Sequence, residues 1–269
     1  MPGIKVNGAD LYYEDTGKGK PIVFIHGYVS DIEDWRHQIN YFSSKYRCLA
    51  LDQRGRGKGT PPKNPDEYTF DLFVDDVYQW LKALKVERFV LDGHSLGGMI
   101  SQGFTLAHPE MVEALVLTDT SSGSTSVSAE QMAYRKVLNE IAFNIGTVAA
   151  FDYDYANDPA TTARYTKHPE TWDRMREKTR TTSPEGYVYV RMGLQNRPVY
   201  TERLSEIKCP TILFCGTDDV GLVEPMKLMA SKLKGSELIW LQNAGHGAMY
   251  DKPGEYNQAL AKFLQKIKY

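Results

Sequence analysis

The sequence has few cysteines, and they form no metal-binding pattern. Three occur among 269 residues, at Cys48, Cys209 and Cys215, and no two of them have the Cys-x-x-Cys spacing typical of zinc sites. Cys209 and Cys215 flank one predicted strand, which would separate them by roughly 20 Å, too far for a disulfide. We therefore expect free thiols, no bound metal and a reducing, cytoplasmic location.

Long apolar runs and an excess of charge of one sign are also absent. No window approaches the roughly 18 consecutive apolar residues of a transmembrane helix, and residues 1–5 lack the apolar region of a secretory signal. With 32 basic and 34 acidic residues the formal net charge is −2, which creates no long-range attraction to nucleic acid or to an anionic membrane. We expect a partner that is a small molecule, and the composition indicates nothing about oligomeric state.

Short apolar runs alternate with helical patterns along most of the chain. Most are continuous, as expected for strands buried on both faces of a parallel sheet, and the first two form a hairpin at Asn7-Gly8. The predicted strands cover residues 4–6, 10–14, 21–25, 47–51, 88–92, 112–118, 210–215 and 237–241. This alternation predicts an α/β fold with a mostly parallel, eight-stranded sheet flanked by helices.

Residues 121–205 interrupt the alternation. They open with a serine-rich turn region at 121–126 and continue with helical patterns, several of which begin at a proline. We therefore predict a core made of residues 1–120 and 206–269, and an inserted helical lid made of residues 121–205. We expect the lid to cover the carboxyl edge of the sheet, because covering it would bury apolar lid positions. Those positions include Met132, Val137, Leu138 and Ile141.

The strongest motif is Gly93-His94-Ser95-Leu96-Gly97, which fits G-x-S-x-G and stands between a predicted strand and a predicted helix. A serine at the tip of so tight a turn has unusual backbone angles, and glycines at the flanking positions avoid clashes. The turn also directs the first amides of the following helix at the reaction centre, where an oxyanion forms. We predict Ser95 as a nucleophile and the amide of Leu96 as one oxyanion-hole donor.

A serine hydroxyl is a weak nucleophile and needs a base, for which histidine is the usual choice. His246 lies between two glycines, directly after the last predicted strand, at the sheet edge where catalytic groups collect. His37 and His108 belong to helices or their ends, and His168 belongs to a helix start in the lid. His94 precedes the serine, so we expect its side chain to be directed away from the hydroxyl. These comparisons favour His246.

The histidine in turn needs a carboxylate that holds its tautomer and stabilises the imidazolium. Asp218 and Asp219 both follow the strand at 210–215. We favour Asp219, because Asp218 falls inside the tight turn. Asp218 remains an alternative, as does Asp119, which follows the strand at 112–118.

One further segment, His26-Gly27-Tyr28, follows the buried strand at 21–25. A loop at this position can supply the second oxyanion-hole amide, which here would come from Tyr28. The Tyr28 side chain can also point into the pocket.

Together these motifs resemble the α/β-hydrolase superfamily, and the resemblance covers essentially the whole chain. The matching segments are His26-Gly27, Asp52-Gln53-Arg54-Gly55-Arg56-Gly57, Gly93-His94-Ser95-Leu96-Gly97-Gly98, Gly216-Thr217-Asp218-Asp219 and Gly245-His246. The order Ser95, Asp219, His246 is the order of nucleophile, acid and base expected of this fold. Within the superfamily the chain resembles the 3-oxoadipate enol-lactonase and small carboxylesterase group. That similarity lies in segments such as Ser183-Pro184-Glu185-Gly186-Tyr187 and Cys209-Pro210-Thr211.

The resemblance implies a serine hydrolase that cleaves a carboxylic ester or lactone through an acyl-enzyme, with no cofactor. A serine nucleophile argues against haloalkane dehalogenases and epoxide hydrolases, which are otherwise similar. A C–C bond hydrolase, a cofactor-free perhydrolase or dioxygenase, and a small-molecule receptor remain alternatives on the same fold. We expect most lid arginines to be solvated, although one of them could bind a substrate carboxylate, as a lactonase would require. These arginines are Arg164, Arg174, Arg176, Arg180, Arg191 and Arg197.

Overall fold

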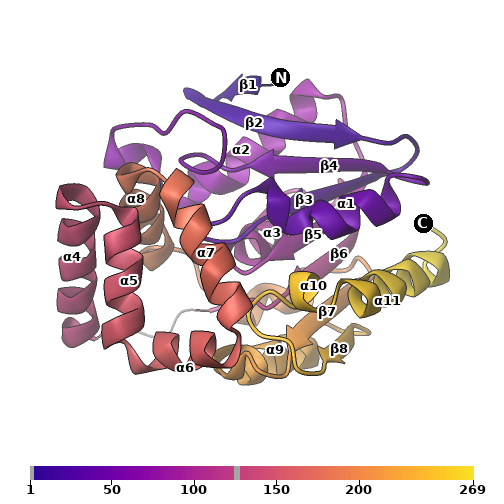
Figure 1. Ribbon diagram of the computed structural model, residues 1–269. Coiled ribbons are helices and arrows are strands. Elements are labelled where there is room, and N and C mark those ends of the chain that lie inside the picture. Colours follow the sequence, from indigo (N-terminus) through magenta and orange to yellow (C-terminus); the bar gives the residue numbers. More distant parts are fainter. Residues whose placement is uncertain (1–2, 124–127) are drawn as a thin grey trace.

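A single eight-stranded sheet forms the centre of the molecule, in the order β1-β2-β4-β3-β5-β6-β7-β8 (Figure 1). The computed structural model describes residues 3–123 and 128–269. The strands are β1 (Gly3–Val6), β2 (Ala9–Thr16), β3 (Pro21–Ile25), β4 (Arg47–Asp52), β5 (Phe89–His94), β6 (Val112–Thr118), β7 (Thr211–Gly216) and β8 (Glu237–Leu241). Strand β2 pairs antiparallel with β1 and β4, whereas the remaining pairs are parallel. The predicted α/β-hydrolase fold with a mostly parallel sheet is confirmed.

Both faces of the sheet are covered, which explains why its central strands are continuously apolar. Along β3, Val23 and Ile25 pack into one core cluster, while Ile22 and Phe24 pack into the other. This is the alternation that a pleated strand produces. The first cluster includes Trp80, Phe104 and Met226 from helices α2, α3 and α9, and the second includes residues of α1 and α11.

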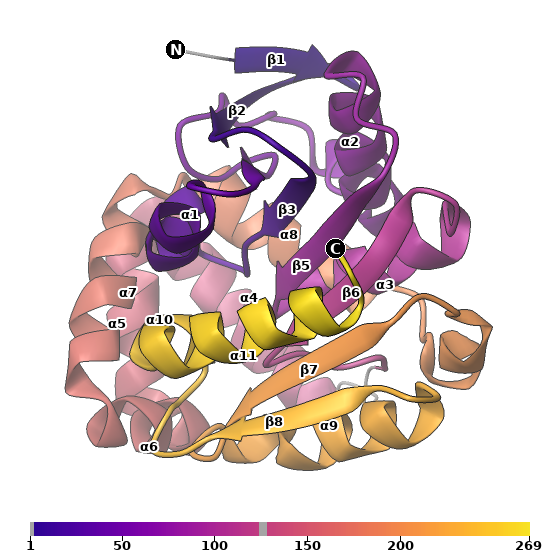
Figure 2. The same cartoon turned by 90° about the vertical axis from the view of Figure 1, so that its right-hand side faces the viewer.

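The helices of the core cover these two faces (Figure 2); α1, α2, α3 and α9 connect successive strands, whereas α10 and α11 follow the last strand. They are α1 (Arg36–Phe42), α2 (Phe70–Ala83), α3 (Leu96–Ala107), α9 (Val220–Lys232), α10 (Ala248–Asp251) and α11 (Pro253–Lys266), with 3₁₀ turns η1 (Ile32–Trp35) and η2 (Pro65–Glu67). None of the helices in the described ranges is long and apolar enough to cross a membrane. The three cysteines are free.

Between β6 and β7 the chain forms a layer of helices beyond the carboxyl ends of the parallel strands (Figure 1). They are α4 (Ala129–Asn144), α5 (Thr147–Asn157), α6 (Pro159–Lys167), α7 (Pro169–Thr181) and α8 (Pro184–Gln195), followed by η3 (Thr201–Glu206). Local sequence explains several starts. Asp158 and Ser183 each cap a helix whose first residue is proline, which is the favoured arrangement. Part of the serine-rich turn predicted at 121–126 lies outside the described residues.

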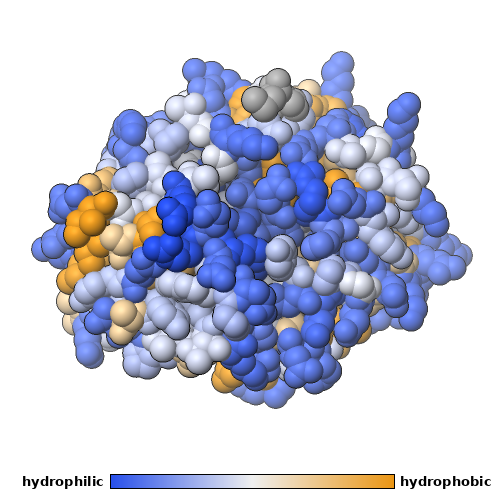
Figure 3. All heavy atoms as spheres, in the orientation of Figure 1, coloured by the Kyte–Doolittle hydropathy of each residue, from blue (hydrophilic) through white to orange (hydrophobic). Residues whose placement is uncertain are grey.

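One expectation about this layer is wrong. Leu138 is buried and Ile141 is partly buried, but Met132 and Val137 are exposed. The reason is that α4 is the outermost helix and contacts α5 and α8 along one stripe only. Figure 3 shows apolar side chains exposed on the side of the molecule where α4 lies; the exposed residues of α4 and its end include Phe143 and Ile145.

Candidate active site

Ser95 stands in a strained turn between β5 and α3. Its φ of 53° and ψ of −115° are rare for a residue with a side chain, and such angles cost on the order of 1–3 kcal/mol. A Cβ atom at Gly93 would lie 2.5 Å from the carbonyl oxygen of Gly97, and one at Gly97 would lie 2.0 Å from the carbonyl oxygen of Ile25. The motif therefore needs both glycines, because strand, turn and helix touch through their backbones.

His246 and Asp219 come from the loops that follow β8 and β7, and they meet Ser95 in one hydrogen-bonded chain. The His246 Nε2 atom lies 2.9 Å from Ser95 Oγ, and its Nδ1 atom lies 2.6 Å from Asp219 Oδ2. The Asp219 side chain is only 1% exposed. Although burial favours its neutral form, the charge and hydrogen bond of His246 hold the pKa of Asp219 below its usual value. Asp219 is therefore ionised against the imidazole.

Two neighbouring aspartates hold other positions. Asp218 accepts bonds from Lys167 Nζ at 2.6 Å and His168 Nε2 at 3.1 Å, which ties the junction of α6 and α7 to the loop after β7. Asp119 accepts the amides of Gly216 and Ala248 at 2.9 and 2.8 Å. Burial and the nearby charge of Asp219 raise the pKa of Asp119 to about 7. Of the three carboxylates, Asp219 is the one bonded to His246 among the described residues.

The loop after β3 passes directly beside Ser95. A Cβ atom at Gly27 would lie 3.3 Å from Ser95 Cβ, so the backbone that carries Tyr28 runs along the site. The Tyr28 hydroxyl donates to the carbonyl oxygen of Tyr187 in α8. Leu96 is the first residue of α3, and an amide at that position has no acceptor within its own helix. Both predicted oxyanion-hole residues therefore flank Ser95.

Val29, the next residue in this loop, was missed by the sequence reasoning. It is buried and has a φ of 45°, which is an outlier for a β-branched side chain. The tight turn that this angle produces keeps the loop against both Ser95 and the helical layer, where Val29 packs on Ala150 and Val188. No sequence signal marks it, since the left-handed region normally favours glycine or asparagine.

The expected direction of His94 is wrong. Its ring lies on the wall of the same cavity as Ser95, with its centroid 5.0 Å from that of His246. The strained turn after it prevents a simple strand alternation. Neither ring nitrogen has a hydrogen-bond partner among the described residues. Burial and the adjacent His246 lower the pKa of His94 to about 3, so His94 stays neutral beside His246.

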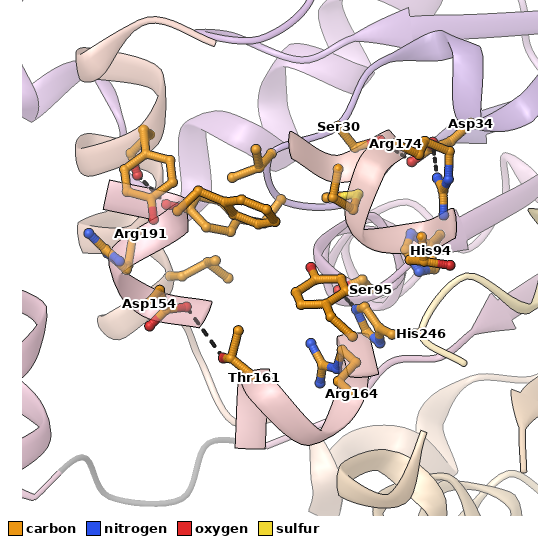
Figure 4. A pocket seen from close by; sticks show the side chains of 18 residues that line it. Ser30, Asp34, His94, Ser95, Asp154, Thr161, Arg164, Arg174, Arg191 and His246 are labelled. Carbon is orange, nitrogen blue, oxygen red and sulfur yellow. Dashed lines mark hydrogen bonds and ion pairs between the residues drawn. The ribbon is translucent and has the colours of Figure 1, made fainter. Parts of the chain in front are cut away.

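A cavity of about 320 Å³ opens in front of Ser95 and His246, between the core and the helices α5 to α8 (Figure 4). Its apolar walls are formed by Val29, Phe151, Tyr165, Met175, Tyr187 and Leu194. Polar and charged groups lie at its edges, among them Asp154, Thr161, Arg164 and Arg191 (Figure 4). Such a space suits a small ligand with an apolar body and a few polar groups.

Buried ion pairs hold the helical layer to the core at one side of this cavity. Asp34 of η1 lies 2.7 Å from Arg174 Nη1 and 2.8 Å from Lys178 Nζ, both from α7, and its side chain is 3% exposed. Burial opposes ionisation, but the charges of Lys178 and Arg174 hold the pKa of Asp34 far below its usual value. Arg174 is therefore one of the lid arginines that is not solvated. Asp34 and Arg174 are 140 positions apart in the sequence, and no sequence pattern predicted this pairing.

Comparisons of the sequence and the fold with those of known proteins identify a family and several similar hydrolases. The sequence matches the family described as alpha/beta hydrolase fold over residues 20–253. The (E)-2-((N-methylformamido)methylene)succinate hydrolase of Acinetobacter baylyi is 27% identical over 262 residues, covering 96% of this chain and 95% of that protein. A thermophilic esterase from Thermogutta terrifontis has a TM-score of 0.86 at 25% identity, with 99% of each chain covered. The enol-lactonase from Burkholderia xenovorans LB400 has a TM-score of 0.84 at 24% identity, covering 98% of this chain and 100% of that one, and this last likeness is one of fold.

Proposed function

The chain belongs to the α/β-hydrolase fold family, and on that basis we propose that it is a serine hydrolase that cleaves a carboxylic ester or lactone through an acyl-enzyme. The observation that carries the proposal is the chain of hydrogen bonds from Ser95 through His246 to Asp219. It opens onto a largely apolar cavity at the carboxyl edge of the sheet. The similarity to a thermophilic esterase over the full chain supports the same reaction class.

The distances allow each step of acyl transfer. Ser95 Oγ attacks the carbonyl carbon while His246 Nε2, at 2.9 Å, takes its proton. Asp219 keeps the other imidazole nitrogen protonated and stabilises the imidazolium. The amides of Tyr28 and Leu96 donate to the oxyanion, and each such donor contributes about 3–4 kcal/mol to the transition state.

His246 then returns the proton to the leaving alcohol, which breaks the carbon–oxygen bond and leaves the acyl group on Ser95. A water molecule attacks the acyl carbon while His246 accepts its proton. Collapse of this second tetrahedral intermediate releases the acid and restores the serine hydroxyl. The helices between residues 121 and 205 act as a lid in this scheme, because they supply most of the cavity wall and exclude bulk water from the acyl group.

Steady turnover of p-nitrophenyl acetate tests the proposal and separates an enzyme from a receptor on the same fold. We expect multiple turnovers by the intact protein and none by Ser95→Ala of unchanged melting temperature. A panel of matched esters, lactones and vinylogous diketones then separates ester or lactone hydrolysis from C–C bond cleavage. Cleavage of the diketones alone would contradict the assignment of the bond.

A further inference from the structure

Arg164 places a charge in the cavity and forms a long ion pair with Asp219, without a hydrogen bond to any described residue. It belongs to α6, and its guanidinium points into the space beside Ser95 and His246 (Figure 4). The nearest carboxylate oxygen is Asp219 Oδ1 at 3.6 Å from Nη2, which is too long for a hydrogen bond. Among the described residues Arg164 donates no side-chain hydrogen bond. The side chain is 39% exposed, so a ligand can reach it.

Three other lid arginines are paired with carboxylates at hydrogen-bond distance. Arg174 pairs with Asp34 at 2.7 Å, and Arg176 pairs with Asp152 through two bonds of 2.8 Å. Arg180 pairs with Glu177 at 2.8 Å. A guanidinium offers several donors in a planar fork that matches a carboxylate. Arg164 presents that fork to the cavity without such a partner.

Three arginines and two aspartates line the cavity, which is one more cation than anion. Asp34 pairs with Arg174 and with Lys178, and Lys178 also pairs with Asp31. Asp154 accepts bonds from Tyr134 and Thr161 at 3.1 and 3.3 Å, and burial raises the pKa of its carboxyl group. Arg191 lies at the far end of the cavity and bonds to the neutral side chain of Asn139. An anionic ligand would therefore meet more cations than anions in this cavity.

We propose that Arg164 is a specificity-determining residue that binds a carboxylate of the substrate, so that the substrate is an ester or lactone that also carries a carboxylate group. This inference rests on the proposed function, since it places the scissile carbonyl at Ser95. A single guanidinium lies beside Ser95 and His246 at this end of the cavity, which suits a substrate with one carboxylate group. The cavity of about 320 Å³ limits the substrate to a small acid rather than a long acyl chain.

Kinetics with two esters of equal shape test the proposal. Monomethyl glutarate is anionic, whereas methyl 4-carbamoylbutanoate replaces its carboxylate by a neutral amide. We expect the intact enzyme to prefer the anion in kcat/KM by tenfold to a hundredfold, the range that one charge-assisted hydrogen-bonded pair supplies. Arg164→Gln should remove this preference, mainly by raising KM for the anion, and Arg164→Lys should restore part of it. Arg180→Gln, which alters an exposed lid arginine paired with Glu177, should leave the ratio as it is.

Calorimetric binding of glutarate and glutaramide gives a readout that does not depend on turnover. We expect glutarate to bind more tightly than glutaramide, and Arg164→Gln to abolish the difference. If neither ester is hydrolysed but this binding difference is found, the proposed reaction fails and the carboxylate site stands. Equal binding of the two ligands by the intact protein overturns the carboxylate site. So does an Arg164→Gln variant that lowers kcat equally for both esters and shifts the pH profile, because Arg164 would then act by positioning Asp219.

Discussion

Replacement of Asp219 by asparagine discriminates among the three carboxylates near His246. The substitution keeps the shape of a side chain that is 1% exposed and 2.6 Å from Nδ1, so we expect the fold to be kept. The amide can face Nδ1 in two ways. Its oxygen leaves the imidazolium without a countercharge, and its NH₂ group forces the tautomer in which Nε2 cannot accept the serine proton. The first orientation weakens the base and the second removes it, and we expect kcat to fall by roughly 10⁴, or about 5.5 kcal/mol.

The two neighbouring aspartates provide matched controls. Asp218→Asn weakens an ion pair with Lys167, which is 61% exposed, and a contact with the largely buried His168. Neither partner contacts Ser95, and a pair with so exposed a lysine contributes about 0–1 kcal/mol, so kcat should change by less than about fivefold. Asp119→Asn turns an NH₂ group toward the amide of Gly216 or Ala248. Leaving a buried donor unpaired costs about 1–3 kcal/mol of folding free energy, so this variant should melt earlier yet stay active when folded.

The assay combines kcat for p-nitrophenyl acetate with a thermal melt of each variant by circular dichroism. The reasoning predicts that the large loss of kcat belongs to Asp219→Asn and the loss of melting temperature to Asp119→Asn. A variant at Asp218 or Asp119 that is folded but four orders of magnitude slower, beside an active Asp219→Asn, would show that the geometry has been assigned the wrong acid.

Two further predictions concern the helical layer. Asp34→Asn should lower the free energy of unfolding by about 3–5 kcal/mol, since it leaves Arg174 without its buried countercharge and Lys178 with Asp31 alone. The exposed pair tested by Asp152→Asn should contribute less than about 1 kcal/mol. Folding lowers the pKa of Asp34, so the ionised carboxylate stabilises the fold above its unfolded pKa of roughly 3.9, and this stabilisation is lost as pH falls through the folded pKa. Urea titrations should therefore show a constant difference in the free energy of unfolding between the intact protein and Asp34→Asn from pH 5 to 9. The difference should be smaller in stronger acid. Met175→Ala enlarges the cavity and should raise kcat/KM for hexanoyl esters relative to acetyl esters by about tenfold. Met192→Ala, on the exposed side of α8, should leave this ratio unchanged. An unchanged ratio in both variants would mean that Met175 does not limit acyl length.

Features set by local chemistry could be predicted from the sequence. The apolar run at β3 indicates a strand covered on both faces, and the structure places Ile22 and Val23 in opposite core clusters. The glycines around Ser95 could be interpreted because a side chain at Gly93 or Gly97 would overlap backbone atoms. Chain order and strand ends were then enough to nominate Asp219 and His246.

Features that depend on tertiary packing could not be predicted. The burial of Leu138 but not Val137 depends on which stripe of α4 meets its neighbours. The pairing of Asp34 with Arg174 joins segments 140 residues apart, and a charged residue in an amphipathic pattern is ordinarily solvated. The left-handed backbone of Val29 opposes its local preference, so only the assembled site explains it.

Covalent labelling of the nucleophile tests the central claim most directly. The intact protein is treated with a fluorophosphonate, digested and examined by mass spectrometry, with Ser95→Ala as the matched control. We expect one modified residue, Ser95, a loss of esterase activity in proportion to the label, and no labelling of the variant. Labelling of another residue in proportion to the loss of activity, or an unlabelled protein that still hydrolyses esters, would contradict it.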